Sequence, residues 1–231
     1  MGLTRFSIAV PTDRLRSIRP EGIHAVTCSW VDRSAHHADR KPFSTTPPYE
    51  TDDGRVAYNV VTFTDEVART VQDGARDRVR FGRMEFPARS LDISVAEEVS
   101  WDELLETPPA TWWLFECLTP LVIRSATFHG VSVTPGTFFG HLRRVWRLYS
   151  DVTIDIDFEE MGLIVDSHDL ETVQTVIRGH PISGFLGSVA FRALAPTPDG
   201  SVVLSALARL AGLTGVGSRT TYGMGVVRPK L

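Results

Sequence analysis

Two adjacent histidines and a lysine lie in one polar stretch near the amino terminus. The stretch reads Ala-His-His-Ala-Asp-Arg-Lys-Pro-Phe and holds His36, His37 and Lys41. Cleavage of RNA without a metal ion needs a base for the 2′-hydroxyl proton, an acid for the departing 5′-oxygen and a cation beside the phosphorus. Histidine, with an unperturbed pKa of about 6.5, suits the first two roles, and lysine suits the third. These three residues are candidate catalytic residues, with a solvated polar loop as the alternative.

A second candidate site is a glycine-rich stretch at residues 212–225, which has five glycines in fourteen residues. It follows a predicted helix over Val202–Ala211 and precedes a predicted strand over Tyr222–Val227, the reverse of the order in a dinucleotide-binding fold. Neither the dinucleotide fingerprint nor the Gly-Lys-Ser/Thr of a nucleoside-triphosphate loop is present. Glycine lets a backbone approach a ligand closely and arginine binds anions, so the stretch suits the phosphates of a polynucleotide. A tight turn with close helix-strand packing is the alternative. The candidate RNA-binding residues of the loop are Gly215, Gly217, Ser218, Arg219, Thr220 and Gly223.

The sequence indicates neither a metal site nor a cofactor. None of the seven histidines belongs to a His-Glu-x-x-His pair or another zinc motif, and no Gly-x-Ser-x-Gly elbow occurs. Cys28 and Cys117 are too few for a disulfide framework and lie far apart, so both are expected to be reduced and buried.

The charge distribution bears on the class of partner. A net charge of −4 argues mildly against nucleic acid, but residues 151–172 hold eight of the 28 acidic residues and no lysine or arginine. The rest of the chain has 20 acidic against 24 basic residues, and all but two of the basic ones are arginine, which suits phosphate and bases. A GC-rich genome is the alternative source of that bias. Three arginines that could lie along an RNA backbone, or form a solvated face, share one predicted helix: Arg143, Arg144 and Arg147.

The composition, with 42% hydrophobic and 23% charged residues, is that of a soluble globular protein. No apolar run approaches the roughly 20 residues that a membrane span needs. The first five residues also lack the apolar core of a signal peptide. We therefore expect a cytoplasmic protein without a membrane partner.

Apolar periodicity predicts an α+β fold of two ferredoxin-like domains. Adjacent prolines at Pro108-Pro109 indicate the boundary, which gives domains over residues 1–108 and 110–231. Each half shows a βαββαβ order, the arrangement that RNA-recognition modules also use. The runs expected to be extended are Leu3–Val10, Phe43–Thr45, Arg55–Phe63, 78–86 and 88–99 in the first half, and Trp112–Leu118, 121–125, Ile154–Phe158, Thr172–Ile177 and Phe185–Ala193 in the second.

The glycine-rich stretch resembles a known signature. Gly-Val-Gly-Ser-Arg-Thr-Thr-Tyr-Gly-Met-Gly before a terminal strand is similar to the carboxyl-terminal motif of the repeat-associated RNA-binding (RAMP) superfamily of CRISPR systems. Within that superfamily, the chain most resembles the endoribonuclease that cuts precursor CRISPR RNA within its repeats. Further segments carry the likeness in the right order along the chain: 36–43, 119–124, 185–191 and 204–210.

This resemblance implies a tandem ferredoxin-like fold and a catalytic histidine about seven residues before a phenylalanine that opens a strand. His36 has that spacing before Phe43, and Lys41 lies where many members have a basic residue that aids cleavage. His37 departs by one position. Because the position of the histidine varies in the family, His24 on the first predicted helix is a further candidate.

The implied activity is metal-independent cleavage of CRISPR repeat RNA to mature guide RNAs, with 2′,3′-cyclic phosphate and 5′-hydroxyl ends. The resemblance also implies that product is retained or passed to a CRISPR effector complex, and both a monomer and a dimer remain open. One alternative is a non-catalytic RNA-binding subunit of such a complex. The other is a ferredoxin-like metabolic protein whose glycine loop is structural.

Overall fold

The chain forms two compact units in a computed structural model that describes residues 2–31, 41–73, 78–123 and 132–230. The first unit contains Met1–Val99 together with Thr221–Gly223, and the second contains Ser100–Thr220 and Met224–Leu231. The division after Val99 precedes the expected boundary at Pro108-Pro109. The first unit thus includes three residues from far along the chain.

The first unit has a ferredoxin-like βαββαβ framework. Its sheet order is β2-β4-β1-β7, so the four main strands, numbered along the unit, lie in the order 2-3-1-4. The short strand β3 also pairs with β4. The framework comprises β1 (Gly2–Val10), α1 (Pro20–Trp30), β2 (Phe43–Thr45), β3 (Tyr49–Glu50), β4 (Val56–Thr62), α3 (Asp65–Gln72) and β7 (Asp92–Ser100), with the 3-10 turns η1 (Leu15–Ser17) and η2 (Ala88–Ser90).

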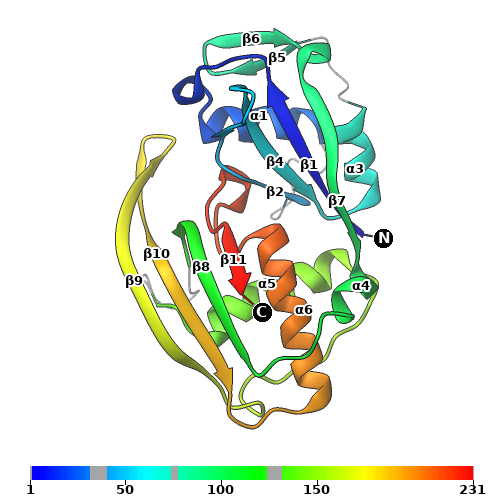
Figure 1. Ribbon diagram of the computed structural model, residues 1–231, viewed down its shortest axis with the longest axis vertical. Helices are drawn as coiled ribbons and strands as arrows, with labels where there is room; N and C mark the ends of the chain where they lie inside the picture. The colour runs from blue at the N-terminus through cyan, green and yellow to red at the C-terminus, as the bar shows by residue number, and fades with distance from the viewer. Residues whose placement is uncertain (1, 32–40, 74–77, 124–131, 231) are drawn as a thin grey trace. The chain divides into compact units, whose positions relative to one another are not determined.

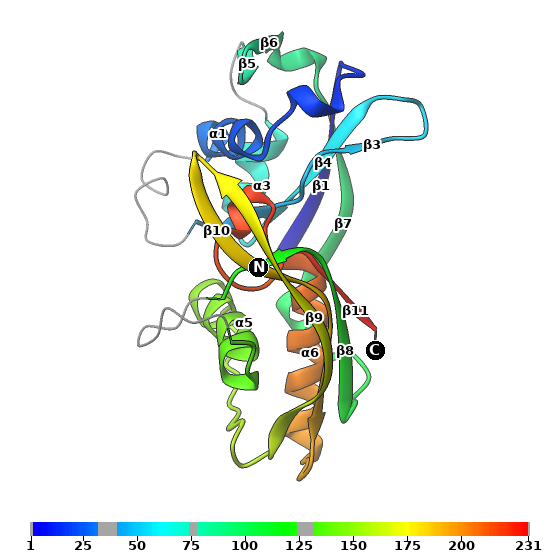
Figure 2. The same cartoon turned by 90° about the vertical axis from the view of Figure 1, so that its left-hand side faces the viewer.

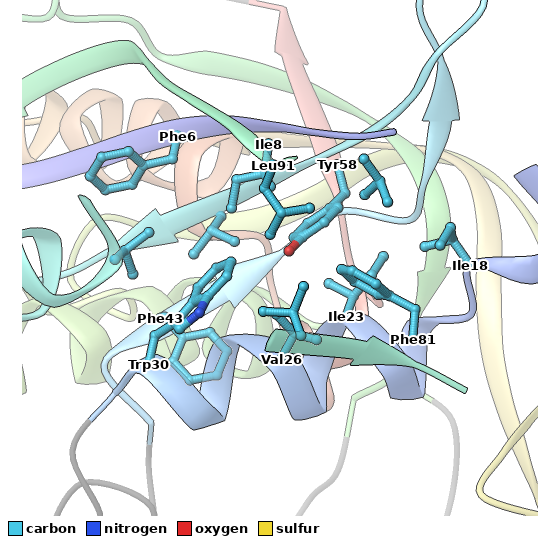
Figure 3. Close-up of a cluster of buried hydrophobic side chains, with 14 of the residues drawn as sticks. Phe6, Ile8, Ile18, Ile23, Val26, Trp30, Phe43, Tyr58, Phe81 and Leu91 are labelled. Carbon is cyan, nitrogen blue, oxygen red and sulfur yellow. The ribbon is translucent and has the colours of Figure 1, made fainter. Parts of the chain in front are cut away.

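A hydrophobic core joins α1 to this sheet (Figure 3). Ile23, Val26 and Trp30 occupy one face of α1, as their helical spacing requires. They cluster with fully buried side chains of the sheet, including Phe6 and Tyr58. Because Ile23, Val26 and Trp30 face the core, His24 and Cys28 lie outside this buried face of α1.

The expected extended run over residues 78–86 is a β-hairpin, β5 (Arg78–Phe81) and β6 (Met84–Pro87). Gly82 has a φ of 62° and supplies the turn. The hairpin lies against α1, where a Cβ on Gly22 would come within 3.3 Å of the Phe81 Cα.

The second unit repeats the framework. Its sheet order is β11-β8-β10-β9, which is 4-1-3-2 when its strands are numbered along the unit. This is the order of the first unit counted from the opposite edge of the sheet. The α+β fold of two tandem ferredoxin-like domains is therefore confirmed. The elements of the unit are α4 (Trp101–Leu105), β8 (Trp112–Leu121), α5 (Pro135–Tyr149), β9 (Leu163–Ile177), β10 (His180–Ala193), α6 (Pro198–Thr214), η3 (Thr220–Tyr222), whose last two residues belong to the first unit, and β11 (Val227–Lys230).

Both long helices of the second unit, α5 and α6, lie on one face of its sheet (Figures 1 and 2). Phe138 and Phe139 of α5 contact Phe115 of β8 and Phe191 of β10 through their rings. Strands β9 and β10 form a long hairpin whose turn includes Arg178, with a φ of 53°. The apolar stripe of α5 thus packs on the sheet and directs the other side of the helix outward.

Three expected strands differ from the structure. In the run expected over 121–125, only Leu121 belongs to a strand, as the last residue of β8, and 122 and 123 belong to none. Ile154–Phe158 alternates in burial but belongs to no strand, and its Phe158 ring packs on Phe139 instead. Tyr222–Val227 begins in a 3-10 turn, and β11 starts only at Val227. Positive φ angles at Gly223 and Gly225 prevent a regular strand there.

Candidate functional site

The candidate lysine lies beside helix α1. Lys41 stands two residues before β2 in sequence, and its Nζ is 2.8 Å from the Sγ of Cys28 and 3.4 Å from the Nε2 of His24. His24 and Cys28 are four residues apart on α1 and therefore share one side of the helix. The fold thus brings an ammonium, an imidazole and a thiol together within the first unit. All three side chains are half-buried.

The His24 ring is held on its other side by the end of the glycine-rich stretch. Its Nδ1 is 3.1 Å from the main-chain oxygen of Thr221. The ring also stacks on Tyr222, with centroids 3.9 Å apart and planes 17° from parallel. A carbonyl oxygen only accepts hydrogen bonds, so a hydrogen bond at this contact requires the proton to be on Nδ1. In the neutral ring, the lone pair of Nε2 then faces Lys41.

Thr221 and Tyr222 are anchored by the glycine that follows them. Gly223 has a φ of 74°, and a Cβ there would come within 2.8 Å of the Pro47 main-chain nitrogen. Only glycine combines this left-handed backbone with so close an approach. The Tyr222 side chain is itself buried. The segment therefore presents the Thr221 carbonyl and the Tyr222 ring from a fixed backbone.

The other glycines of the stretch serve close backbone contacts within the second unit. A Cβ on Gly217 would come within 2.5 Å of the Val122 oxygen, and a Cβ on Gly215 would come within 2.9 Å of the Gly225 oxygen. The main-chain N–H of Ser218 donates to the Val122 oxygen at 2.7 Å. The protein's own packing therefore requires these glycines, whatever else the loop binds.

Arg219 is the exposed residue of this stretch, since the others from 212 to 225 are buried or half-buried. Its φ is 67°, in the left-handed region that costs a non-glycine residue about 1 kcal/mol. A glycine would adopt this backbone at lower cost.

The three arginines of α5 differ in their surroundings. Arg143 donates from Nη1 to the Ile156 oxygen at 3.1 Å, and its guanidinium carbon lies 4.9 Å from the centroid of the Phe158 ring. Arg144 and Arg147 are exposed on the same helix. Arg143 therefore has a role in packing, whereas the side chains of the other two extend into solvent.

His36 and His37 lie outside the described residues. His24, which was a further candidate from sequence, is the histidine that the described structure places beside Lys41. Its partner Thr221 is 197 residues away along the chain, so no local pattern could have shown the contact. A histidine and a cysteine at helical spacing on the polar side of α1 were the only signal in the sequence.

Two kinds of feature are absent from the described residues. They contain no cluster of three or more histidine, cysteine or acidic residues able to hold a metal ion. No described helix has both the length and the apolar character of a membrane-spanning segment.

Burial raises the pKa of the Cys117 thiol to about 11, so this second cysteine is an inert core residue.

Comparison with known proteins identifies the relationship. Residues 115–227 match the family model described as CRISPR-associated endoribonuclease Cas6. This part of the chain, just under half of its length, is therefore similar to that family. This match confirms the resemblance that the glycine-rich signature indicated. No protein of curated function matches the sequence.

Solved structures show the Cas6-like fold over the whole chain. A structure titled as a Cas6 product complex superposes with a TM-score of 0.83 at 19% identity, covering 100% of both chains. A second Cas6 product complex gives 0.77 at 22% identity, covering 99% of each chain. Thermus thermophilus Cas6 gives 0.69 at 20% identity, covering 99% of this chain and 98% of its own. At these identities the likeness establishes the fold.

Proposed function

We propose that this protein is an endoribonuclease that cuts CRISPR repeat RNA without a metal ion. The observation that carries the proposal is the contact of Lys41 Nζ with His24 Nε2 at 3.4 Å, on a fold whose second half matches the Cas6 model. An imidazole and an ammonium side by side are groups that transesterification of RNA needs. Two of the related structures are titled as complexes with product, and a third with a substrate mimic.

In the proposed reaction, the 2′-oxygen attacks the adjacent phosphorus while a base removes its proton. The bond to the 5′-oxygen then breaks as an acid protonates that oxygen. The products are a 2′,3′-cyclic phosphate and a 5′-hydroxyl, and no atom of water is consumed. Base and acid are two histidines, His24 and one of His36 and His37, which precede Lys41 by four or five residues. Lys41 stabilises the extra negative charge on the phosphorane.

The RNA backbone is bound by the glycine-rich stretch, chiefly through the exposed Arg219. The other proposed contacts in the stretch are Gly215, Gly217, Ser218, Thr220 and Gly223. Arg144 and Arg147 on α5 extend this basic surface, and Arg143 supports it by packing. We expect the mature guide RNA to pass to a CRISPR effector complex in the cytoplasm.

The test is cleavage of labelled repeat RNA by the purified protein in excess EDTA. The expected result is a single cut that disappears when hydrogen replaces the 2′-hydroxyl beside the cut site. A cyclic phosphate on the upstream product would confirm the chemistry. Tight binding without cutting would refute the enzyme and favour a non-catalytic RNA-binding subunit. If the protein neither cut nor bound RNA in low salt, both roles would be refuted, because phosphate contacts dominate such affinity.

A further inference from the structure

We propose that Tyr222 and the main-chain oxygen of Thr221 are positioning groups that hold His24 with Nε2 as its reactive nitrogen. The inference rests on the proposed function, because it names how one catalytic histidine of that reaction is oriented. Neither group needs to touch the RNA to act in this way. Both act through the imidazole ring.

The Thr221 oxygen selects the tautomer. At 3.1 Å from Nδ1 it can only accept a hydrogen bond, so it stabilises the ring with a proton on Nδ1. Nε2 lies 3.4 Å from Lys41 Nζ and 3.6 Å from Cys28 Sγ, and this sulfur is 4.0 Å from Nδ1. Both of these groups can donate to a lone pair, and Lys41 cannot accept. The contacts on both sides of the ring favour the same tautomer.

Tyr222 sets the plane of the ring. The two rings are stacked 3.9 Å apart at 17°, so a rotation of the imidazole about its Cβ–Cγ bond would break the stack. Phe43, at the start of β2, lies 6.3 Å away, centroid to centroid. With its plane fixed by the stack and one nitrogen fixed by the carbonyl, the ring has a single orientation. A proton donor or acceptor therefore meets Nε2 from the Lys41 side.

The same short segment would connect RNA binding to the orientation of the histidine. Arg219, the proposed phosphate contact, precedes Tyr222 by three residues, and the 3-10 turn η3 (Thr220–Tyr222) lies between them and ends at the stacked ring. Gly223 then fixes the segment against Pro47. RNA that binds Arg219 would thus act on the residues that hold His24. Tyr222 is a positioning residue in this scheme, and His24 is the group that reacts.

The first test reads the tautomer directly in the free protein. Nitrogen NMR of ¹⁵N-histidine-labelled protein, with His24→Gln to assign the signal, distinguishes a protonated Nδ1 from a protonated Nε2. A neutral histidine in water prefers the proton on Nε2, so a protonated Nδ1 is the informative result and the one expected. A protonated Nε2 would overturn the inference without any assay of activity.

The second test separates positioning from binding. Tyr222→Phe keeps the stacked ring and Tyr222→Leu removes it. Both substituents are apolar, so the two variants differ chiefly in the aromatic ring. We expect Tyr222→Phe to cut at close to the wild-type rate. We expect Tyr222→Leu to lose about 10²-fold in the single-turnover rate, the cost of a misplaced group, with its Kd for repeat RNA within about threefold. Its NMR signal should show the loss of the protonated Nδ1.

The outcomes keep the two proposals apart. Wild-type cutting with equal single-turnover rates for both variants, or a Tyr222→Leu defect confined to Kd, would overturn the positioning role and leave the proposed function intact. A wild-type protein that never cuts would overturn the proposed function, and the tautomer measurement would still decide how His24 is held. If Tyr222→Leu fails to fold, the wild-type NMR signal remains decisive.

Discussion

Removal of His24 and Lys41, singly and together, is the most informative perturbation. His24→Gln removes a proton-transfer group, for which the usual cost is 10²–10⁴-fold in rate, or about 3–5 kcal/mol. Lys41→Met keeps the length of the side chain and removes its charge. The expected cost of one lost donor to the transition state is about 10²–10³-fold. If the two groups acted independently, the double variant would lose the product of these factors.

The structure predicts a much smaller combined loss. Nε2 of His24 and Nζ of Lys41 are 3.4 Å apart, so either substitution disturbs the partner that remains. Groups that act as a unit show strongly non-additive effects. We expect the double variant to be no more than about tenfold slower than the slower single variant, which corresponds to a coupling free energy of about 1.4 kcal/mol or more.

The assay is single-turnover cleavage of repeat RNA in EDTA, with enzyme in excess and Kd measured separately. Lys230→Met is the matched control, because Lys41 and Lys230 are the only lysines and Lys230 is exposed on β11. The control should match the wild-type rate. Rate losses that multiply within about twofold would refute the argument that the two groups act as one unit.

Three further changes test other features. Arg219→Gly should reduce the salt dependence of RNA affinity by about one phosphate contact, because Arg219 is the proposed contact to the RNA backbone. Unchanged filter binding would argue against the contact. Iodoacetamide should modify the half-buried Cys28 and not Cys117, because burial raises the pKa of the Cys117 thiol to about 11. Alkylation should abolish cleavage unless Cys28 is first replaced by serine. Mass spectrometry locates the adduct, and a fully active alkylated protein would contradict the site. Gly225→Ala should lower the free energy of unfolding in urea by about 2–4 kcal/mol, because its φ is 66° and a Cβ would come within 1.9 Å of a main-chain oxygen. The control Gly140→Ala on α5 meets nothing within 4 Å and should be stabilising. Equal unfolding midpoints for the two variants would refute this interpretation of the loop.

Much of the fold was accessible from sequence because local signals agreed with one another. Thr134 caps α5 by accepting from the Thr137 N–H, and Pro135 follows it, so a strong local signal marks the start of the predicted helix that holds Arg143. Ile154–Phe158 misled because its alternation in burial is real, yet the segment packs on α5 without joining a sheet. Alternation reports which side chains are buried, and strand pairing is a separate matter.

The candidate site was less accessible. Lys41 was predicted as a catalytic residue from its neighbours in sequence, and it does lie beside an imidazole. That imidazole belongs to His24, and the contacts that orient it come from Thr221 and Tyr222. His24 and Thr221 are 197 residues apart in sequence, so no periodic pattern could have predicted their contact. The glycine-rich stretch was noticed for its composition, but composition alone did not show that most of its glycines are required by contacts with Val122, Val216 and Pro47.

The inclusion of Thr221–Gly223 in the first unit has a consequence for biosynthesis. Helix α1 and Lys41 are synthesised before the carbonyl and the ring that hold His24, because Thr221 follows His24 by 197 residues. A nascent or prematurely terminated chain would carry the histidine and the lysine without the residues that orient them. Under the proposed function, a chain that stops before Thr221 would cleave slowly at most, so unfinished chains would act little on cellular RNA.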